Sequence, residues 1–489
     1  MRIEPLNVIR HSDELEPDDK RVIARFFDFG NVRRFRAILK RIMKLNETRV
    51  VELLAEVMKD FSSRHRNLEA EFLESYAEVC DYLPVGTVVS ESRRLLIGAY
   101  FMMEYSIESA ALFNPSIVLH PDQGGVPEGA ARFLMSLRAT GEGHVSSIVF
   151  RQGLLHASGE LHLDPTTPFA YAPAPVPDRE FERGWFLSKI DDLDIPHELV
   201  LAMLEALPEQ FTLSQLQRTI DEFMKSPVHP KAFESAAEDM LWLARASYEV
   251  RFPGECAPSE TVIFPATENE SRGMEDLRLV RFVDDDQTVH YYGTYTAYNG
   301  WRLLPMLLDT CDFKTLRVTP LSGRYARNKG MALFPRRVNG QYLCVSRHDG
   351  ESLFLLRSDE IGFWNDSKSL YKPTASWELI QVGNCGSPLE TEAGWILLTH
   401  GVGPVREYCI GALLLDRDEP GRILGRLREP LIVPTESERE GYVPNVVYSC
   451  GAMVHNGLLV IPYAMSDSRT TFAEVSVNDL IQLLRSSGP

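Results

Sequence analysis

The chain has 489 residues, which is long for a single hydrophobic core and predicts two or more structural units or one large repetitive unit. A hydrophobic content of 44% with 25% charged residues is ordinary for a globular protein. The formal net charge of −18 argues against a nucleic-acid binder, because the average field would repel a polyanion. Any anion that the protein binds must therefore be held by a local cluster of cations.

No apolar run reaches the ~18 to 20 residues that a membrane span needs, and the N-terminus is too polar for a secretory signal. We therefore expect a cytoplasmic protein without a membrane partner. Seven scattered cysteines without a C-x-x-C pair argue against structural zinc and a disulfide framework. The chain also lacks the usual metal, nucleotide and serine-hydrolase motifs, so we expect neither a metal nor an organic cofactor.

The first part of the chain has a helical pattern. From about Asp18 to Leu112 apolar residues recur at a spacing of three and four, and Ser90 is a plausible N-cap for the last of these helices. Residues 1–110 are therefore predicted to form an α-helical N-terminal region. We interpret its basic residues as a solvated helix face, with partner binding as the alternative. They are Arg33, Arg34, Arg36, Lys40, Arg41 and Lys44.

The pattern changes at Phe113, where short strand-like runs alternate with Gly, Pro and Asp. A second helical block interrupts them at about residues 180–250. Strands then continue to the end, apart from a short amphipathic segment at 477–484. Many short strands with frequent turns predict a sandwich, a barrel or a propeller, and no clean sequence period chooses among them.

Residues 271–300 carry the most informative charges. Glu275, Asp276 and Arg278 stand at the head of an alternating apolar run, and a turn at 284–287 leads into a second run, so the stretch predicts a β-hairpin. A carboxylate fixed at a strand end beside an arginine suits an acid catalyst. A surface salt bridge is the alternative interpretation.

Further polar clusters lie at predicted strand ends. Their members are Asn114 and Ser116 with Arg138; Arg327, Asn328 and Lys329; Arg347, His348 and Asp349; and a glycine-rich stretch that ends at His400. Arginine offers a rigid fork of donors for phosphate, and a histidine can be protonated by that anion. Two arginines and a histidine could thus converge on an oxyanion, although each alone has a structural explanation.

Taken in order, these clusters resemble glycoside hydrolase family 130, the β-mannoside phosphorylases and β-mannosidases built on a five-bladed β-propeller. The matching segments are 113–118, 273–279, 292–300, 327–335, the strand end at Arg347, 386–403, 441–451 and 463–467. The resemblance implies a mainly β fold, a five-bladed propeller over residues 111–489. The N-terminal region and the helical insertion at about 180–250 have no counterpart in compact members of the family.

The resemblance also implies roles for particular residues. Asp276 matches the sole catalytic acid, which in this family is thought to protonate the glycosidic oxygen through a hydroxyl of the bound mannosyl unit. The residues implied to contact that sugar are Asn114, Ser116, Arg138 and Asp467. The residues implied to bind phosphate are Arg327, Asn328, Arg347 and His400.

These roles favour an inverting phosphorylase that cleaves a β-mannoside with inorganic phosphate and releases α-mannose 1-phosphate. Phosphate is itself an anionic nucleophile, so cations replace the second carboxylate that an inverting hydrolase needs. Two departures from the family pattern stand out. Gln381 occupies the place of a usual lysine, which implies either a weakened phosphate site or a nearby replacement such as Lys329. Leu277 occupies the place of a usual proline.

Two alternatives stay open. A β-mannoside hydrolase would need a base, for which Asp349, Glu390 and Glu392 are the nearest candidates in the sequence. A non-catalytic propeller that binds carbohydrate or protein is the third interpretation. The expected partners are an oligosaccharide or small glycoside and phosphate as co-substrate, and the helical additions could support a homo-oligomer.

Overall fold

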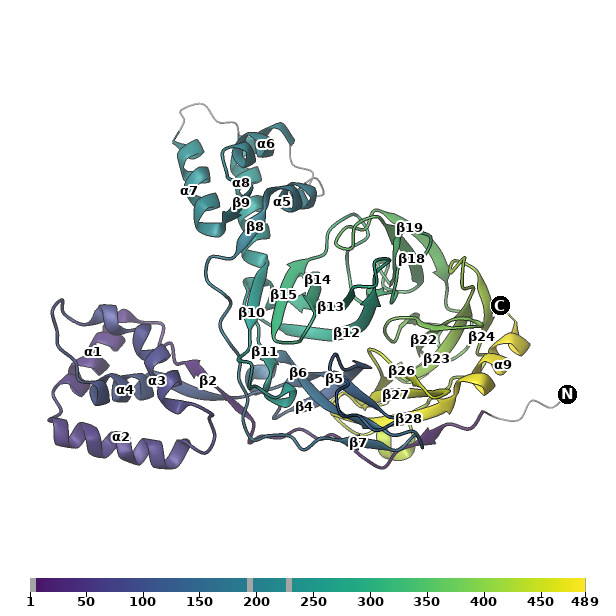
Figure 1. The fold of residues 1–489 in the computed structure, drawn as a ribbon, viewed down its shortest axis with the longest axis horizontal. Coiled ribbons are helices and arrows are strands. Elements are labelled where there is room, and N and C mark those ends of the chain that lie inside the picture. The colour runs from purple at the N-terminus through teal and green to yellow at the C-terminus, as the bar shows by residue number, and fades with distance from the viewer. Residues whose placement is uncertain (1–5, 191–196, 226–230, 489) are drawn as a thin grey trace.

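The computed structural model describes residues 6–190, 197–225 and 231–488. Figure 1 shows most strands gathered in one body, from which two groups of helices project. The protein is mainly β, because five antiparallel sheets of four or five strands make up this body. Within the described ranges, every helix is too short or too polar to cross a lipid bilayer.

Apart from one strand of the first sheet and one strand of the fifth, the five sheets follow one another along the chain. The first contains β11 (Val262–Ile263), β6 (Ser146–Leu155), β5 (Ala131–Thr140) and β4 (Ala111–Leu119), with β7 (Leu161–Leu163) beside β6. The second contains β10 (Tyr248–Arg251), β15 (Thr315–Pro320), β14 (Leu303–Thr310), β13 (Val289–Tyr298) and β12 (Gly273–Val283). The predicted hairpin is therefore present as β12 and β13.

The other three sheets are also antiparallel. The third contains β16 (Ala332–Leu333), β17 (Tyr342–Ser346), β18 (Leu353–Ser358) and β19 (Asp366–Tyr371). The fourth contains β20 (Gln381–Asn384), β22 (Gly394–Val402), β23 (Tyr408–Leu415) and β24 (Ile423–Arg426), with β21 (Leu389–Thr391) beside β22. The fifth contains β25 (Val447–Tyr448), β27 (Leu458–Met465), β28 (Arg469–Ser476) and β1 (Ile9–Arg10), with β26 (Met453–His455) beside β27.

The fifth sheet joins the two ends of the chain. Strand β1 pairs antiparallel with β28, with Ile9 opposite Glu474 and Arg10 opposite Ala473. The start of the region predicted to be helical is thus part of the β body. The C-terminal helix α9 (Val477–Ser487) covers the predicted amphipathic segment, and Leu480 and Leu484 pack into a core shared by the fourth and fifth sheets.

The N-terminal helices form a separate group. Helices α1 (Val32–Met43), α2 (Glu47–Phe61), α3 (Leu68–Ala77) and α4 (Glu91–Tyr100) lie between β2 (Val22–Phe26) and β3 (Met102–Ser106), which pair with each other. Ser90 caps α4 as predicted, because its side chain accepts a hydrogen bond from Arg93 N. Residues such as Phe35, Leu96 and Phe101 give the group its own apolar core.

The second group of helices also has its own core. It contains β8 (Glu180–Glu182), α5 (Arg183–Ile190), α6 (His197–Glu205), β9 (Gln210–Thr212), α7 (Leu213–Met224) and α8 (Lys231–Ala246). Phe186, Phe211 and Met240 are among its fully buried side chains. Figure 1 shows the group projecting from the second sheet, next to β10.

Candidate active site

The edge strands β4 and β12 lie against each other, and both are interrupted at a matching position. The register shifts between Phe113 and Ser116 in β4, and between Glu275 and Arg278 in β12. The residues inside these bulges, Asn114 and Asp276, have left-handed φ angles of 50° and 58°. Asn and Asp tolerate this conformation better than other residues, and a bulge redirects a side chain. Consequently, Asn114 Nδ2 donates a hydrogen bond of 2.7 Å to Asp276 Oδ1.

Cations surround the carboxylate of Asp276. Arg138 Nη1 lies 3.4 Å from Asp276 Oδ1. Burial alone would raise the pKa of Asp276, but the positive charges of Arg138, Arg278 and Lys329 outweigh it, and the hydrogen bond from Asn114 adds to them. The pKa of Asp276 is therefore below its ordinary value, and the group is a carboxylate at neutral pH in the absence of ligands.

Glu275 shares the cations of its neighbour. Its carboxylate accepts a hydrogen bond of 3.0 Å from Arg138 Nη2 and pairs with Lys329 Nζ. Arg138 thus bridges Glu275 and Asp276, two successive residues of β12. A surface salt bridge, the alternative interpretation of these charges, does not fit, because Glu275 is 9% exposed and Arg278 is 2% exposed.

Asp467 lies near the same group of charges. It follows β27, has a φ angle of 51°, and its carboxyl interacts electrostatically with Asp276 and Arg138. Burial and the negative charge of Asp276 raise the pKa of Asp467 to about 6, although Arg138 and Arg406 oppose the shift. The structure therefore brings together Asn114, Arg138, Asp276 and Asp467, four of the residues that the sequence assigns to catalysis and sugar binding.

Arg278 connects this group to the fourth and fifth sheets. Its Nη1 donates to the carbonyl oxygen of Asp276 at 2.8 Å, and its Nε donates to Asn384 Oδ1 at 3.1 Å. Its Nη2 donates to Tyr448 OH at 2.6 Å. Because every nitrogen of this buried guanidinium has a partner, Arg278 is a fixed link between the acid and the neighbouring sheets.

His400 lies next to Asn384, the residue of the fourth sheet to which Arg278 donates. Its Nδ1 donates to the carbonyl oxygen of Asn384 at 3.2 Å. Its ring packs against that of Tyr448 in a T-shaped arrangement, with the ring centroids 4.8 Å apart. Gly383 leaves room for the ring, since a Cβ there would lie 2.3 Å from His400 Cε1. Burial and the positive charges of Arg347 and Arg278 hold the pKa of His400 well below its ordinary value. The imidazole is thus neutral before an anion binds, although the sequence predicts a histidine that phosphate protonates.

Arg347 directly follows β17 and lies close enough to His400 to lower its pKa. Its Nε and Nη1 are buried, and neither has a hydrogen-bond partner within the described part of the chain. Leaving buried donors unpaired costs free energy. An oxyanion that accepted bonds from both would remove that cost.

The segment that carries Arg327 and Asn328 runs beside Arg347. A Cβ on Gly330 would lie 3.9 Å from both Arg347 Cβ and Asn384 Nδ2. Asn328 has a left-handed φ of 64° and faces a small gap that Arg278 and Gly330 also line. Arg327 is exposed. Burial lowers the pKa of His348, and the positive charge of Arg327 adds to that shift. Arg327 therefore lies at the rim of the site rather than inside it.

Comparison with known proteins bears on this arrangement. The family model described as beta-1,4-mannooligosaccharide phosphorylase, glycoside hydrolase family 130, matches residues 234–486, which is more than half of the chain. The chain belongs to glycoside hydrolase family 130. The resemblance seen in the sequence is thereby confirmed.

Curated phosphorylases are similar to part of this chain. A 1,2-beta-oligomannan phosphorylase of Thermoanaerobacter sp. is 33% identical over 218 residues, which are 44% of this chain and 72% of that protein. A beta-1,2-mannobiose phosphorylase of Listeria innocua is 26% identical over 45% of this chain and 63% of its own length. A beta-1,4-mannooligosaccharide phosphorylase of Ruminococcus albus is 29% identical over 42% of this chain and 64% of its own length. The match thus spans less than two thirds of the latter two relatives.

A solved structure of the Listeria innocua beta-1,2-mannobiose phosphorylase in complex with beta-1,2-mannobiose aligns with a TM-score of 0.46 at 17% identity. The alignment covers 78% of this chain and 94% of that chain.

The structure places Ser116, which the resemblance assigns to sugar binding, away from any accessible surface. Ser116 is fully buried, and its Oγ accepts a hydrogen bond of 2.9 Å from Leu279 N. The hydroxyl thereby joins β4 to β12 at the level of their bulges. Ser116 thereby stabilises the strands that carry Asn114 and Asp276, and its side chain is too buried to contact a sugar.

The three candidate bases for hydrolysis are directed elsewhere. Asp349 Oδ1 accepts hydrogen bonds of 2.8 Å from Glu351 N and Ser352 N within a turn. Glu390 pairs with Arg336 and Arg417. Glu392 is exposed at a turn between β21 and β22. Asp349 is thus held in a turn and Glu390 in ion pairs, whereas Glu392 points to solvent at a turn.

Several residues of the site were missed or given no role of this kind from the sequence. Asn384 and Tyr448 were not named, Glu275 and Arg278 were named only as charges beside Asp276, and Lys329 was named only as a replacement for the usual lysine. All five lie inside or beside segments that carry the resemblance, so the signal was present. Their roles depend on contacts between different sheets, which no local pattern contains.

Proposed function

We propose that this family 130 protein is an inverting phosphorylase that cleaves a β-mannoside with inorganic phosphate and releases α-mannose 1-phosphate. The observation that carries the proposal is Arg347, whose Nε and Nη1 are buried donors without a partner in the described chain. The neutral His400 lies beside it, and Arg278 and Asn384 connect both to Asp276. A cationic site and a single acid are what phosphorolysis requires.

We interpret the five sheets as the blades of a five-bladed β-propeller, with the site where their edge strands converge. All five sheets supply residues at or next to the site, which supports this interpretation. In sheet order they are Asn114, Asp276, Arg347, His400 and Tyr448. Convergence of edge strands at one end of an axis explains why residues so distant in sequence interact.

In this mechanism, phosphate binds to Arg347 and its neighbours Arg327 and Asn328. With Nδ1 donating to Asn384, the Nε2 atom of neutral His400 can accept a hydrogen bond from a protonated phosphate oxygen. A phosphate oxygen held in line with the anomeric carbon then attacks it, and no carboxylate base is needed. Attack from the face opposite the leaving group inverts the configuration.

Asp276 is the proposed acid, and its charge state sets a condition on catalysis. Because its pKa is lowered by surrounding cations, the phosphate-free site holds a carboxylate that cannot donate a proton. A bound phosphate would offset part of this positive field and raise the pKa of Asp276. The acid thus gains its proton when the nucleophile is present, and a hydroxyl of the mannosyl unit passes the proton to the glycosidic oxygen.

The mannosyl unit is proposed to lie against Asn114, Arg138 and Asp467, which border the carboxylate of Asp276. Amide, guanidinium and carboxyl groups together can donate to and accept from sugar hydroxyls. The β-1,2- and β-1,4-mannosides named for the relatives are the first substrates to test.

The test compares β-1,2- and β-1,4-mannobiose with and without phosphate, followed by phosphorus NMR of the product. The expected result is turnover that depends on phosphate and yields α-mannose 1-phosphate. Equal release of free mannose without phosphate would overturn the proposal and favour the hydrolase. A product in the β configuration would overturn the inverting mechanism alone.

A further inference from the structure

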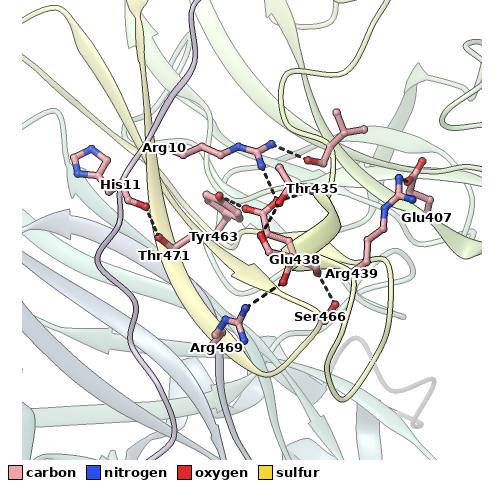
Figure 2. A network of polar contacts seen from close by, with 12 residues as sticks. Arg10, His11, Glu407, Thr435, Glu438, Arg439, Tyr463, Ser466, Arg469 and Thr471 are labelled. Atoms are coloured by element: carbon pink, nitrogen blue, oxygen red, sulfur yellow. Dashed lines mark hydrogen bonds and ion pairs between the residues drawn. The ribbon is translucent and has the colours of Figure 1, made fainter.

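A network of polar contacts fixes the N-terminal strand to the fifth sheet (Figure 2). Its centre is Glu438, the last residue of a short helix, η6 (Glu436–Glu438), which precedes β25. Glu438 is 5% exposed, and its carboxylate accepts hydrogen bonds from Arg10 Nη1 at 2.6 Å, Tyr463 OH at 2.6 Å and Thr435 N at 2.7 Å. Arg10 comes from β1, more than 400 residues away in sequence.

Similar glutamates precede other edge strands. Glu270 precedes β12 and accepts hydrogen bonds from Tyr248, Tyr295 and the backbone of Thr267. Glu378 precedes β20 and accepts hydrogen bonds from Tyr371 and the backbone of Thr374. A buried glutamate that combines a tyrosine with a turn backbone is thus a recurring way to fix the entry into an edge strand. Glu438 adds a contact to an arginine of the N-terminal strand.

The network continues from Glu438 to the proposed sugar site. Ser466 Oγ donates a hydrogen bond of 2.7 Å to the carbonyl oxygen of Glu438, and Ser466 N donates one of 2.7 Å to Val446 O. Ser466 and Asp467 have φ angles of 49° and 51°, so two successive residues are left-handed. Such a backbone persists only where surrounding contacts hold it. In this turn, Ser466 contacts Glu438 and Val446, and Ser468 accepts hydrogen bonds from Leu112 N and Tyr442 N.

We propose that Glu438, fixed by Arg10, is a positioning residue that holds Asp467 toward the mannosyl unit. The proposal rests on the proposed function, because it gives Asp467 a substrate contact. It makes the N-terminal strand β1 part of the machinery for sugar binding, although β1 itself is remote in sequence from every site residue. Neither Glu438 nor Arg10 needs to touch the substrate.

The network predicts a selective effect on the sugar. Asp467 lies on the side of Asn114 and Asp276, whereas the phosphate site is built around Arg347 and His400. Loosening the turn at Ser466 should therefore weaken mannoside binding and leave phosphate binding unchanged. A general loss of stability would instead affect both substrates or lower the amount of active enzyme.

The test measures KM for the mannoside and KM for phosphate separately in Glu438→Gln and Ser466→Ala. We expect each variant to raise the mannoside KM about tenfold, the equivalent of one or two lost hydrogen bonds, with a phosphate KM within about twofold of wild type. The substitution Arg10→Lys keeps the positive charge and should restore most of what Arg10→Met loses. Unchanged mannoside KM values in folded variants, or equal changes in both KM values, would overturn the proposal.

Glu474→Gln is the matched control. Glu474 in β28 lies 3.5 Å from His11 Nε2, so its loss also removes one carboxylate between the N-terminal segment and β28, but in the described chain neither side chain of this pair contacts Glu438 or η6. Its two KM values should equal those of wild type. If Glu438→Gln does not fold, Ser466→Ala decides the question, because it removes a single hydroxyl. Wild-type enzyme without phosphate dependence would refute the proposed function, which is a separate outcome.

Discussion

Replacement of Arg347 by methionine tests the phosphate site most sharply. The side chain keeps much of its length but loses the two buried donors, Nε and Nη1, that have no partner in the described chain. A hydrogen bond between charged groups contributes about 1.5–3 kcal/mol. Two such bonds at the lower end give about 3 kcal/mol, which corresponds to an increase of about 100-fold in phosphate KM.

The same substitution should not destabilise the phosphate-free enzyme. Arg347 gains no compensating hydrogen bond from these two nitrogens before the anion arrives, so Tm without phosphate should stay level or rise. The increase in Tm that wild-type enzyme shows with phosphate should disappear in Arg347→Met. The assay is initial rate against phosphate concentration, together with thermal melts at both conditions. An unchanged phosphate KM, or a phosphate-dependent Tm shift equal to that of wild type, would refute the reasoning.

Three further predictions concern single residues. Asp276→Asn should lower kcat about 10²- to 10⁴-fold at unchanged folding, as expected for a lost general acid, and steady-state rates check this. The pKa of Asp467 is raised from 3.8 to about 6, so its protonated form stabilises the fold below pH 3.8 and this contribution is lost as pH rises through about 6. The Tm of wild type minus that of Asp467→Asn should therefore fall between pH 4 and pH 7, and a constant difference would contradict the shift. Gln381 is neutral and donates a hydrogen bond of 3.3 Å to Tyr408 OH, whose ring stacks on that of His400. Gln381→Lys should lower phosphate KM severalfold, because it adds a positive charge near the anion. An equal or higher phosphate KM would show that this side chain lies outside the anion site.

Sequence patterns predicted the local elements that carry the site better than the contacts between those elements. The hairpin of β12 and β13, the cap at Ser90 and the final helix all follow from local periodicity and capping. The position of Asp276 at a strand head also follows from the pattern. Its left-handed backbone does not, because a bulge depends on the partner strand.

Long-range contacts account for what was missed. The pairing of β1 with β28 joins the two ends of the chain, and no local signal in a two-residue strand could indicate it. The burial of Arg278 depends on Asn384 and Tyr448, which belong to other sheets. Ser116 was assigned to sugar binding through the resemblance to family 130, whereas its hydroxyl accepts a hydrogen bond from the backbone of β12.

The internal repetition of the fold is also hidden in the sequence. The turns before β12 and β25 share a capping box of Thr, two residues and Glu, at Thr267–Glu270 and Thr435–Glu438. Four residues of shared pattern are too few to produce a visible period when the connecting loops differ in length. The repetition becomes evident only in the structure, where each of these glutamates accepts a hydrogen bond from a tyrosine, Tyr295 for Glu270 and Tyr463 for Glu438.

A crystal structure with bound phosphate and a mannobiose is the most direct measurement of the central claim, that one acid and one anion site face each other across the sugar. The predicted result is a phosphate oxygen within hydrogen-bond distance of Arg347 Nε or Nη1 and near His400 Nε2, with the anomeric carbon between it and Asp276. Phosphate bound elsewhere, or a mannosyl unit that leaves Asp276 and Arg347 on the same side of the anomeric carbon, would contradict the account.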